Sequence, residues 1–524
     1  MVRKIALVLY HQVMMIKDYF IFLNDWFIRV LKYPFNLKFR MSDVYCDHMV
    51  LQRDKLLRIR GHASPGARVT LSFAGYDKDT FAGINGNWCI ILPPISKGGP
   101  YTMKVCSGWR RLVFRDIIMG EVWLVTGASF MRMHLWGAST ATKEINLWKK
   151  HLEEGNQLFP LRIFTGDFHL FWYRFPFPYY VCRYFNKYKL LLYPHWKTVT
   201  AQTVGSIPAY PYYFAKEISI SLDVPVGLVD ASLSGCPTES YVERELLEER
   251  MPDLLKGKSN PYFFSDFVGK VRKKNLMFAF NKYQKHFYDP GYAFESKIRS
   301  LDAYPIKGAL FGGIFWHKDL ALRFIPLFSM MVSCWRRNWQ EDIPVYFLQP
   351  GRFRDERFMS SGLPEMRDVT RRVSDIVPDT YLIIAYDMVQ MGEKDVIHPK
   401  ERSVVGWRFG RSALYHTYGC TDIIPSGPKY LQAVLEDNLI RIRFEWSEGL
   451  HTSDGKEPAE FEISTDDCHF VPVVAKIENG QIVIENNFNS TPVYIRHAWK
   501  EYPDVNVVNS QEWPLSTFCE KIVN

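Results

Sequence analysis

The residues best able to do chemistry begin with a serine at the end of an apolar run. Residues 122–125 are continuously apolar, and Ser129 follows them behind the conformationally permissive Gly127. A hydroxyl exposed at the turn after a buried strand, near a helix N-terminus that stabilises negative charge, is suited to attack a carbonyl carbon. Most serines in such a place are helix caps, so the pattern alone leaves both roles open.

A serine nucleophile needs a histidine base that is held by an acceptor. Asp395 and His398 are three residues apart, so both side chains can point the same way from a loop. Pro399 suits the first turn of a helix that would follow, with Val405 on its apolar face. The alternative interpretation makes Asp395 a cap and His398 an ordinary surface residue.

A glycine turn supplies the third possible component of such a site. The apolar run at 226–229 is followed by Ser234 and Gly235, and a glycine readily presents its backbone N–H to a developing oxyanion. An isolated glycine turn would mean little. Taken together, the three segments have the parts that a serine esterase requires: nucleophile, base and oxyanion donor.

The elements that must position these residues form an alternating pattern. Continuous apolar runs are typical of strands that are buried on both faces of a parallel sheet. Helical patterns lie between the runs, for example at 213–222 and 327–339. The sequence therefore predicts a doubly wound α/β domain over residues 116–427, with strands at 122–125, 226–229, 308–311, 345–348 and 381–384.

Both flanks of this domain have the pattern of β structure. In residues 41–115, Val69, Leu71 and Phe73 alternate with polar residues, which is the period of a half-buried strand, and we expect a small β-sandwich. Residues 428–524 return to strand-like patterns around Ile440 and Val483, which predicts a C-terminal β domain.

Two further segments fit these domains poorly. Residues 1–40 start like a short signal sequence but lack an obvious cleavage site, so they are either a degraded signal, an amphipathic extension or a misassigned start. Residues 167–196 are aromatic and basic without a clean period. They are either an insertion packed on the core or an aromatic platform for a sugar.

Composition excludes several classes of protein. The net charge of +9 is spread over 524 residues, whereas nucleic-acid-binding proteins usually gather basic residues on one face. The nine cysteines include no CxxC pair, and no HExxH or Cys/His cluster suggests a metal site. No uninterrupted apolar stretch is long enough to cross a membrane. We therefore expect no metal, no cofactor, no nucleic-acid partner and no membrane span.

Several short blocks, in order along the chain, resemble the sialate O-acetylesterase family. Each block is short, but chance explains the whole set poorly. The blocks lie at residues 47–54, at 120–131 with Gly127-Ala128-Ser129-Phe130-Met131 in place of the family's GQSNM, at 224–235, at 395–400, and at 496–499 and 513–516.

The resemblance implies an SGNH-hydrolase catalytic domain flanked by β-sandwich domains. It implies removal of O-acetyl groups from sugars, sialic acids in the animal members, with no metal or organic cofactor. Ser129 would be the nucleophile, His398 the general base and Asp395 the residue that orients it. The backbone N–H groups of Ser129 and Gly235 would form part of the oxyanion hole. A lysosomal or secreted location would follow, and the sequon at Asn489 is in keeping with it.

The chain departs from the family where the nucleophile is supported. Ala128 and Phe130 replace two polar residues, and Ser234 replaces one of two glycines. The family's third block, WYQGESN, has an asparagine that completes the oxyanion hole, and in an ungapped alignment His317 takes its place (Trp316 after a one-residue slip). Losing one such donor typically costs a factor of ~10²–10³ in rate. The sequence therefore predicts a carbohydrate O-acetylesterase, with a catalytically silent glycan- or protein-binding relative as the alternative.

Overall fold

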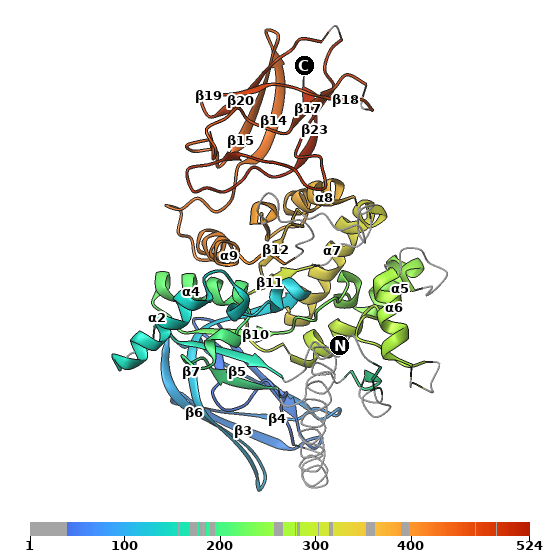
Figure 1. Cartoon of the computed structure of the whole chain (residues 1–524). Coiled ribbons are helices and arrows are strands. Elements are labelled where there is room, and N and C mark those ends of the chain that lie inside the picture. The colour runs from blue at the N-terminus through green and yellow to red at the C-terminus, as the bar shows by residue number, and fades with distance from the viewer. Residues whose placement is uncertain are drawn as a thin grey trace, which may run out of the picture.

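The fold was analysed in a computed structural model of the chain, and Figure 1 shows three layers of structure along it. The N-terminal strands lie at one end, a parallel sheet with helices lies in the middle, and a C-terminal sheet lies at the other end. The structure describes residues 39–155, 158–166, 176–177, 182, 185–188, 194–255, 266–277, 279, 283–301, 303–313, 318–352, 362–388, 398–466, 468–488 and 490–523.

A central sheet of six parallel strands confirms the predicted strand runs. Its order is β13-β12-β11-β7-β10-β8, and every neighbouring pair along this path is parallel, while β9 closes one edge antiparallel to β8. The strands are β7 (Arg110–Gly127), β8 (Leu161–Thr165), β9 (His195–Thr198), β10 (Val226–Asp230), β11 (Gly308–Gly312), β12 (Val345–Leu348) and β13 (Thr380–Ile383).

Helices cover both faces of this sheet, as the doubly wound prediction requires. Val122 and Leu124 of β7 pack into one core with α7 (Lys318–Trp339) and α8 (Leu363–Ile376). Trp123 and Val125 pack on the opposite face. That second face is covered by α2 (Ala141–Glu153), α4 (Ala209–Leu222) and α9 (Ser403–His416). Burial on both faces explains why these strands are continuously apolar. Two further helices are α5 (Arg244–Arg250) and α6 (Asp266–Asn275).

The N-terminal strands are joined to the central sheet through β7. The first part of β7 pairs antiparallel with β6, whereas its last part, from residue 121, pairs with β10 and β11. The expected domain boundary at 115/116 therefore falls inside one continuous strand. The alternation expected around Val69 is confirmed in β3, whose residues are alternately exposed and buried. The strands are β1 (Val50–Gln52), β2 (Leu57–His62), β3 (Arg68–Phe73), β4 (Tyr76–Phe81), β5 (Asn87–Leu92) and β6 (Gly98–Ser107).

The C-terminal strands form an eight-stranded sheet with its own apolar core, in which Ile440 and Ile484 are fully buried. The order is β18-β17-β21-β23-β14-β15-β20-β19, and β16 pairs with β22 separately. The strands are β14 (Lys429–Glu436), β15 (Leu439–Glu445), β16 (His451–Thr452), β17 (Phe461–Ser464), β18 (Phe470–Pro472), β19 (Ala475–Glu478), β20 (Gln481–Glu485), β21 (Tyr494–His497), β22 (Val507–Val508) and β23 (Phe518–Val523).

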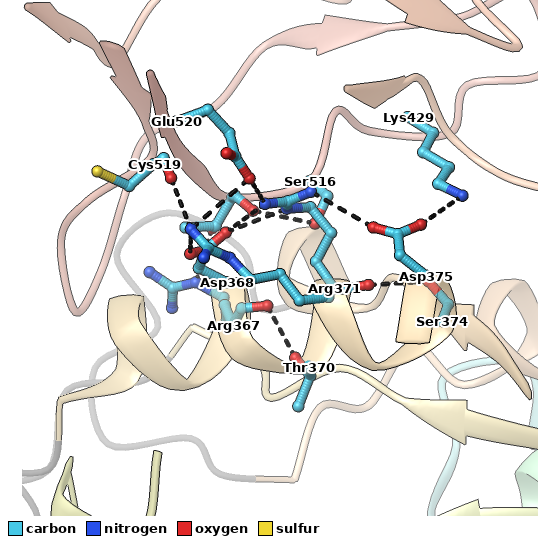
Figure 2. Close-up of polar contacts among 12 residues, drawn as sticks. Arg367, Asp368, Thr370, Arg371, Ser374, Asp375, Lys429, Ser516, Cys519 and Glu520 are labelled. Carbon is cyan, nitrogen blue, oxygen red and sulfur yellow. Dashed lines mark hydrogen bonds and ion pairs between the residues drawn. The ribbon is translucent and has the colours of Figure 1, made fainter. Parts of the chain in front are cut away.

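An ion network attaches this sheet to α8, as Figure 2 shows. Arg371, which is almost fully buried, pairs with Asp368 at 2.8 Å and with Glu520 of β23. Arg372 donates to the carbonyl of Cys519 at 2.8 Å. At the rim, Lys429 and Asp375 lie 2.7 Å apart.

Some predicted segments lie outside the described residues. They include residues 1–38, Asn489 and most of 167–196, so neither interpretation of the aromatic segment is tested there. Three of its described members, Phe177, Cys182 and Phe185, are buried in the core. No helix within the described part of the chain has the length and hydropathy needed to span a membrane.

Candidate active site

Ser129 stands on a tight turn at the carboxyl end of β7. Gly127, the last residue of the strand, has a φ of +102°, and a Cβ there would lie 2.3 Å from the carbonyl oxygen of Gly312. The next residue, Ala128, donates its N–H to that same carbonyl at 2.7 Å. Only glycine fits this close approach, and the turn then starts a short 3₁₀ helix at Ser129–Arg132.

His398 reaches the serine from a loop 269 residues later in the chain. Its Nε2 lies 2.8 Å from the Oγ of Ser129, which is hydrogen-bonding distance. The order of the strands reverses at β7: β10 and the earlier β8 lie on one side of it, and β11, β12 and β13 follow one another on the other side. Open α/β sheets bind ligands outside such a switch point. The predicted meeting of Ser129 and His398 at this sheet edge is confirmed.

The loop that carries His398 is tied to the segment that follows the nucleophile. The buried guanidinium of Arg402 donates from Nε to the carbonyl of Pro399 at 3.0 Å and from Nη1 to the carbonyl of His134 at 2.6 Å. Ser139 donates its N–H to the carbonyl of Lys400 at 2.8 Å. These bonds hold the base loop and the nucleophile segment in one fixed arrangement.

The start of the helix after His398 corrects one expectation. Pro399 was expected in its first turn, but α9 begins at Ser403, and Pro399 lies in the loop before it. The carboxylate of Glu401 takes up the N–H of Ser403 at 2.8 Å, and its other oxygen accepts from the Ser139 hydroxyl. Glu401 thus accepts the first N–H of α9, and the carbonyl of Pro399 accepts a hydrogen bond from Arg402.

The surroundings of His398 favour its neutral form. Burial of the ring and, to a smaller extent, the nearby positive charge of Arg402 together lower its pKa to about 4. Phe130 packs edge-on against the ring at 5.3 Å between ring centroids, while His398 as a whole residue remains exposed to solvent. At neutral pH the imidazole is therefore unprotonated and able to accept a proton from Ser129.

The loop after β10 lies against the nucleophile turn. Leu233 donates its N–H to the carbonyl of Gly127 at 2.7 Å, which places the two loops side by side. Gly235 has a φ of +73°, and a Cβ there would collide with the hydroxyl of Tyr288. Within the described residues, neither the Ser129 N–H nor the Gly235 N–H has a hydrogen-bond acceptor. As far as the described residues extend, both donors are therefore available to an oxyanion.

Two predicted site residues lie outside the described residues. They are Asp395, within 389–397, and His317, within 314–317. Their proposed roles are therefore not tested by the geometry. Nor, in the part of the chain that is described, do three His, Cys, Asp or Glu side chains gather in a way that could hold a metal ion.

A group of buried charges lies beneath the two loops, and sequence reasoning missed it. Asp230, at the end of β10, accepts the Ser232 N–H at 3.0 Å, and Arg132 donates to the Ser232 carbonyl at 3.0 Å. Lys297 feels the charges of both Asp230 and Arg132, yet its Nζ has no hydrogen-bond partner among the described residues. Burial lowers the pKa of Lys297 to about 7. Burial also raises the pKa of Glu239 to about 7.

Comparisons with known proteins agree with the resemblance found in the sequence. No family model matches the chain. The sialate O-acetylesterase of Mus musculus is 21% identical over 519 residues, covering 89% of this chain and 90% of the mouse protein. The human sialate O-acetylesterase is 20% identical over 506 residues, covering 89% and 88%. A carbohydrate acetylesterase from Xanthomonas citri has the same fold, with a TM-score of 0.72 at 23% identity, covering 92% of this chain and 99% of that one.

Proposed function

We propose that this chain, whose resemblance to the sialate O-acetylesterase family holds over nearly its whole length, is a carbohydrate O-acetylesterase of the SGNH-hydrolase type. The observation that carries the proposal is the 2.8 Å approach of Ser129 Oγ to His398 Nε2 at the carboxyl edge of the parallel sheet. The two residues are far apart in sequence, so chance is a poor explanation for their meeting at the nucleophile turn.

The proposed reaction proceeds through an acyl-enzyme. Ser129 Oγ bonds to the carbonyl carbon of the acetyl group while its proton passes to His398 Nε2. The tetrahedral intermediate collapses, the bond to the sugar oxygen breaks, and His398 returns the proton to that oxygen. Water, deprotonated by His398, then attacks the acetyl carbon; the bond to Ser129 Oγ breaks, His398 returns the proton to Oγ, and acetate is released. Asp395 is assigned to orient the histidine and stabilise its charged form.

The oxyanion would be held by the free N–H groups of Ser129 and Gly235. His317 is the candidate for the third donor, in the position of the family's asparagine. This support is thinner than in the family pattern, because Ala128 and Phe130 carry no polar side chain beside the nucleophile. We therefore expect slower turnover than the unaltered motif would give. The apolar ring of Phe130 against His398 is also the observation that favours the silent, glycan- or protein-binding alternative.

The substrate class follows from the relatives. We assign O-acetylated sugars, sialic acids among them, as substrates and a lysosomal or secreted location, because the curated relatives of similar length are sialate O-acetylesterases. No step of the proposed reaction requires a metal or an organic cofactor.

The test is hydrolysis of a chromogenic acetyl ester by the wild-type chain and by Ser129→Ala and His398→Ala. Loss of a triad member typically costs ~10³-fold or more in turnover, and both variants should fall that far. Ser72→Ala, an exposed serine on β3, is the matched control and should retain full activity. A fluorophosphonate should also label the wild-type chain at Ser129. Equal rates in wild type and Ser129→Ala, without labelling, would contradict the proposal and favour the silent relative.

A further inference from the structure

Trp136 is a large aromatic side chain left in solvent close to the candidate site. Its side chain is 68% exposed, and it lies on the short 3₁₀ helix Leu135–Gly137, which follows the helix that begins at Ser129. Single exposed apolar residues are common on protein surfaces and need no explanation by themselves. The orientation and the position of this tryptophan set it apart.

The indole is held in one orientation. Its N–H donates to Nδ1 of His134 at 3.0 Å, and the two rings meet edge to face with centroids 6.1 Å apart. Leu135, between them in sequence, is fully buried and donates its N–H to the carbonyl of Ile207 at 2.8 Å. Leu135 anchors the backbone and His134 orients the indole, so the side chain of Trp136 would lose little conformational freedom when a ligand binds to its ring face.

The same segment is fastened to the loop of the candidate base. The guanidinium of Arg402 contacts both the carbonyl of Pro399, beside His398, and the carbonyl of His134, two residues before Trp136. A Cβ on Gly137 would lie only 3.0 Å from Nη1 of that guanidinium. The guanidinium of Arg402 thus bonds to the residue after His398 and to His134, and it lies against Gly137 on the other side of Trp136. Trp136 therefore lies on a segment that is tied directly to the loop of His398, seven residues after Ser129.

We propose that Trp136 is an aromatic subsite that stacks against the apolar face of the substrate's sugar ring. This inference rests on the proposed function, because it assigns a binding residue to the same acetyl-sugar substrate. A pyranose has a face of C–H groups, and a fixed indole offers a large apolar surface and a negative π-face to receive it. Ala128 and Phe130, beside Ser129, offer no polar side chain to a sugar hydroxyl, so a contact with the apolar face of the ring is chemically suited to this site.

The chain offers a matched control in Trp109, which is 85% exposed. It lies in the turn between β6 and β7, at the amino end of the strand whose carboxyl end leads to Ser129. At about 3.3 Å per residue, a strand of this length separates the two ends by tens of ångströms. Removing Trp109 deletes a comparable exposed indole without touching the site.

The experiment compares Trp136→Ala, Trp136→Phe and Trp109→Ala on glucose pentaacetate, on O-acetylated N-acetylneuraminic acid and on ethyl acetate. We expect Trp136→Ala to raise KM about tenfold for at least one acetylated sugar, with kcat nearly unchanged, because stacking acts before the chemical step. Ethyl acetate, which has no ring, should be hydrolysed as by the wild type. Trp136→Phe should recover most of the loss, and Trp109→Ala should behave as wild type. An equal loss on sugars and ethyl acetate, or no loss on either sugar, would overturn the subsite.

A binding measurement separates this inference from the proposed function. Calorimetric binding of the two acetylated sugars to Ser129→Ala does not require turnover. Weaker binding by about tenfold in the Ser129→Ala, Trp136→Ala double variant supports the subsite even if the wild-type chain proves inactive. Equal affinity in the single and double variants, or no saturable binding to Ser129→Ala, rejects the subsite whatever the esterase assay shows.

Discussion

The buried charges at the junction of α8 and the C-terminal sheet differ from those beneath the loops after β7 and β10. At the junction, Arg371 is closed between Asp368 and Glu520 (Figure 2). Beneath the loops, Lys297 has no hydrogen-bond partner among the described residues, although it is just as deeply buried. At the junction the buried cation is bonded directly to carboxylates, whereas among the described residues beneath the loops the ammonium of Lys297 has only the unbonded charge of Asp230 to oppose it.

The difference separates a structural role from a functional one. A buried charge that keeps its partners contributes to holding elements together, and it is costly to break. A buried charge without a partner costs stability, and such groups gather where a site needs an electrostatic field. Lys297 lies beside Asp230, Arg132 and Cys236, close to the turn that carries Gly235. We infer that its charge is retained for the site rather than for the fold.

The largest effect on stability is expected at the junction. Arg371→Met removes the more deeply buried of the two arginines that pair with Asp368 and Glu520, leaves both carboxylates to Arg372 alone, and should lower the free energy of unfolding by about 3 kcal/mol. Urea denaturation measures the change, and the acetyl-ester assay below the unfolding transition should show little loss. Lys476→Met, which breaks the exposed pair with Glu485, is the control and should leave stability nearly unchanged. If Arg371→Met were as stable as the wild type, the buried charges at the junction would have no greater structural role than Lys297.

At the site, the largest effect after the triad itself is expected at Arg402. Arg402→Met frees the carbonyls of Pro399 and His134, so the base loop loses its tie and kcat should fall by about 10²-fold. The variant also removes a positive charge that lowers the pKa of His398.

The pH profile distinguishes this positioning role from simple loss of stability. Activity requires neutral His398, so wild-type kcat/KM should fall only as the pH drops towards about 4. In Arg402→Met the pKa of His398 rises, and the acid limb should move to higher pH. Arg402→Lys, which keeps the charge, should lose rate with a smaller shift of the limb. An unmoved limb in Arg402→Met would show that the arginine acts on geometry alone.

Lys297→Met should have the opposite effect on stability from Arg371→Met. Removing an unpaired buried charge should stabilise the chain by about 1–4 kcal/mol at pH 7, while esterase activity falls. The folded pKa of about 7 lies below the unfolded value, so the unfolded state binds more protons between pH 7 and the ordinary lysine range. Stability of the wild type therefore rises across that range, and this rise should vanish in the variant. Denaturation curves at pH 7 and pH 9.5 test both points, and a destabilised variant would contradict the comparison.

The smallest expected effect is that of a chelator. The proposed reaction draws its base from His398, so dialysis against EDTA should leave acetyl-ester hydrolysis unchanged. Activity that is lost on chelation and restored by zinc would contradict the proposed mechanism. It would also remove the reason for assigning a functional role to the buried charges near Ser129.

The sequence was sufficient for the parts of the site that depend on local pattern. Ser129 could be found because a buried strand and a glycine turn precede it, and the family-like blocks brought in His398 and Gly235. Arg402 and Lys297 could not be found, because a basic residue in a helical or polar stretch is expected on the solvated surface. Only the tertiary structure shows that these two are buried. The predicted start of α9 at Pro399 was wrong because the helix begins only at Ser403, whose N–H is accepted by the carboxylate of Glu401.

The fold was predictable to the same extent. The apolar strands and the alternation in β3 were predicted correctly because each reflects how many faces of a strand are buried. The boundary at 115/116 falls within the part of β7 that still pairs with β6, and β7 changes neighbours only a few residues later, between Met119 and Glu121. Asp395 and His317 themselves lie outside the described segments, so the roles assigned to them remain predictions.

The continuity of β7 has a consequence for how the chain can be divided. β7, which ends at the turn of Ser129, begins in a hairpin with β6. Excising residues 39–115 would therefore remove the first part of the strand that positions Ser129. The C-terminal sheet starts at Lys429, after α9 has ended at His416, and its removal severs no strand of the central sheet. The N-terminal strands therefore share a strand with the central sheet and with the turn of Ser129, whereas the C-terminal sheet is joined to the central domain by side-chain contacts such as that of Arg371 with Glu520.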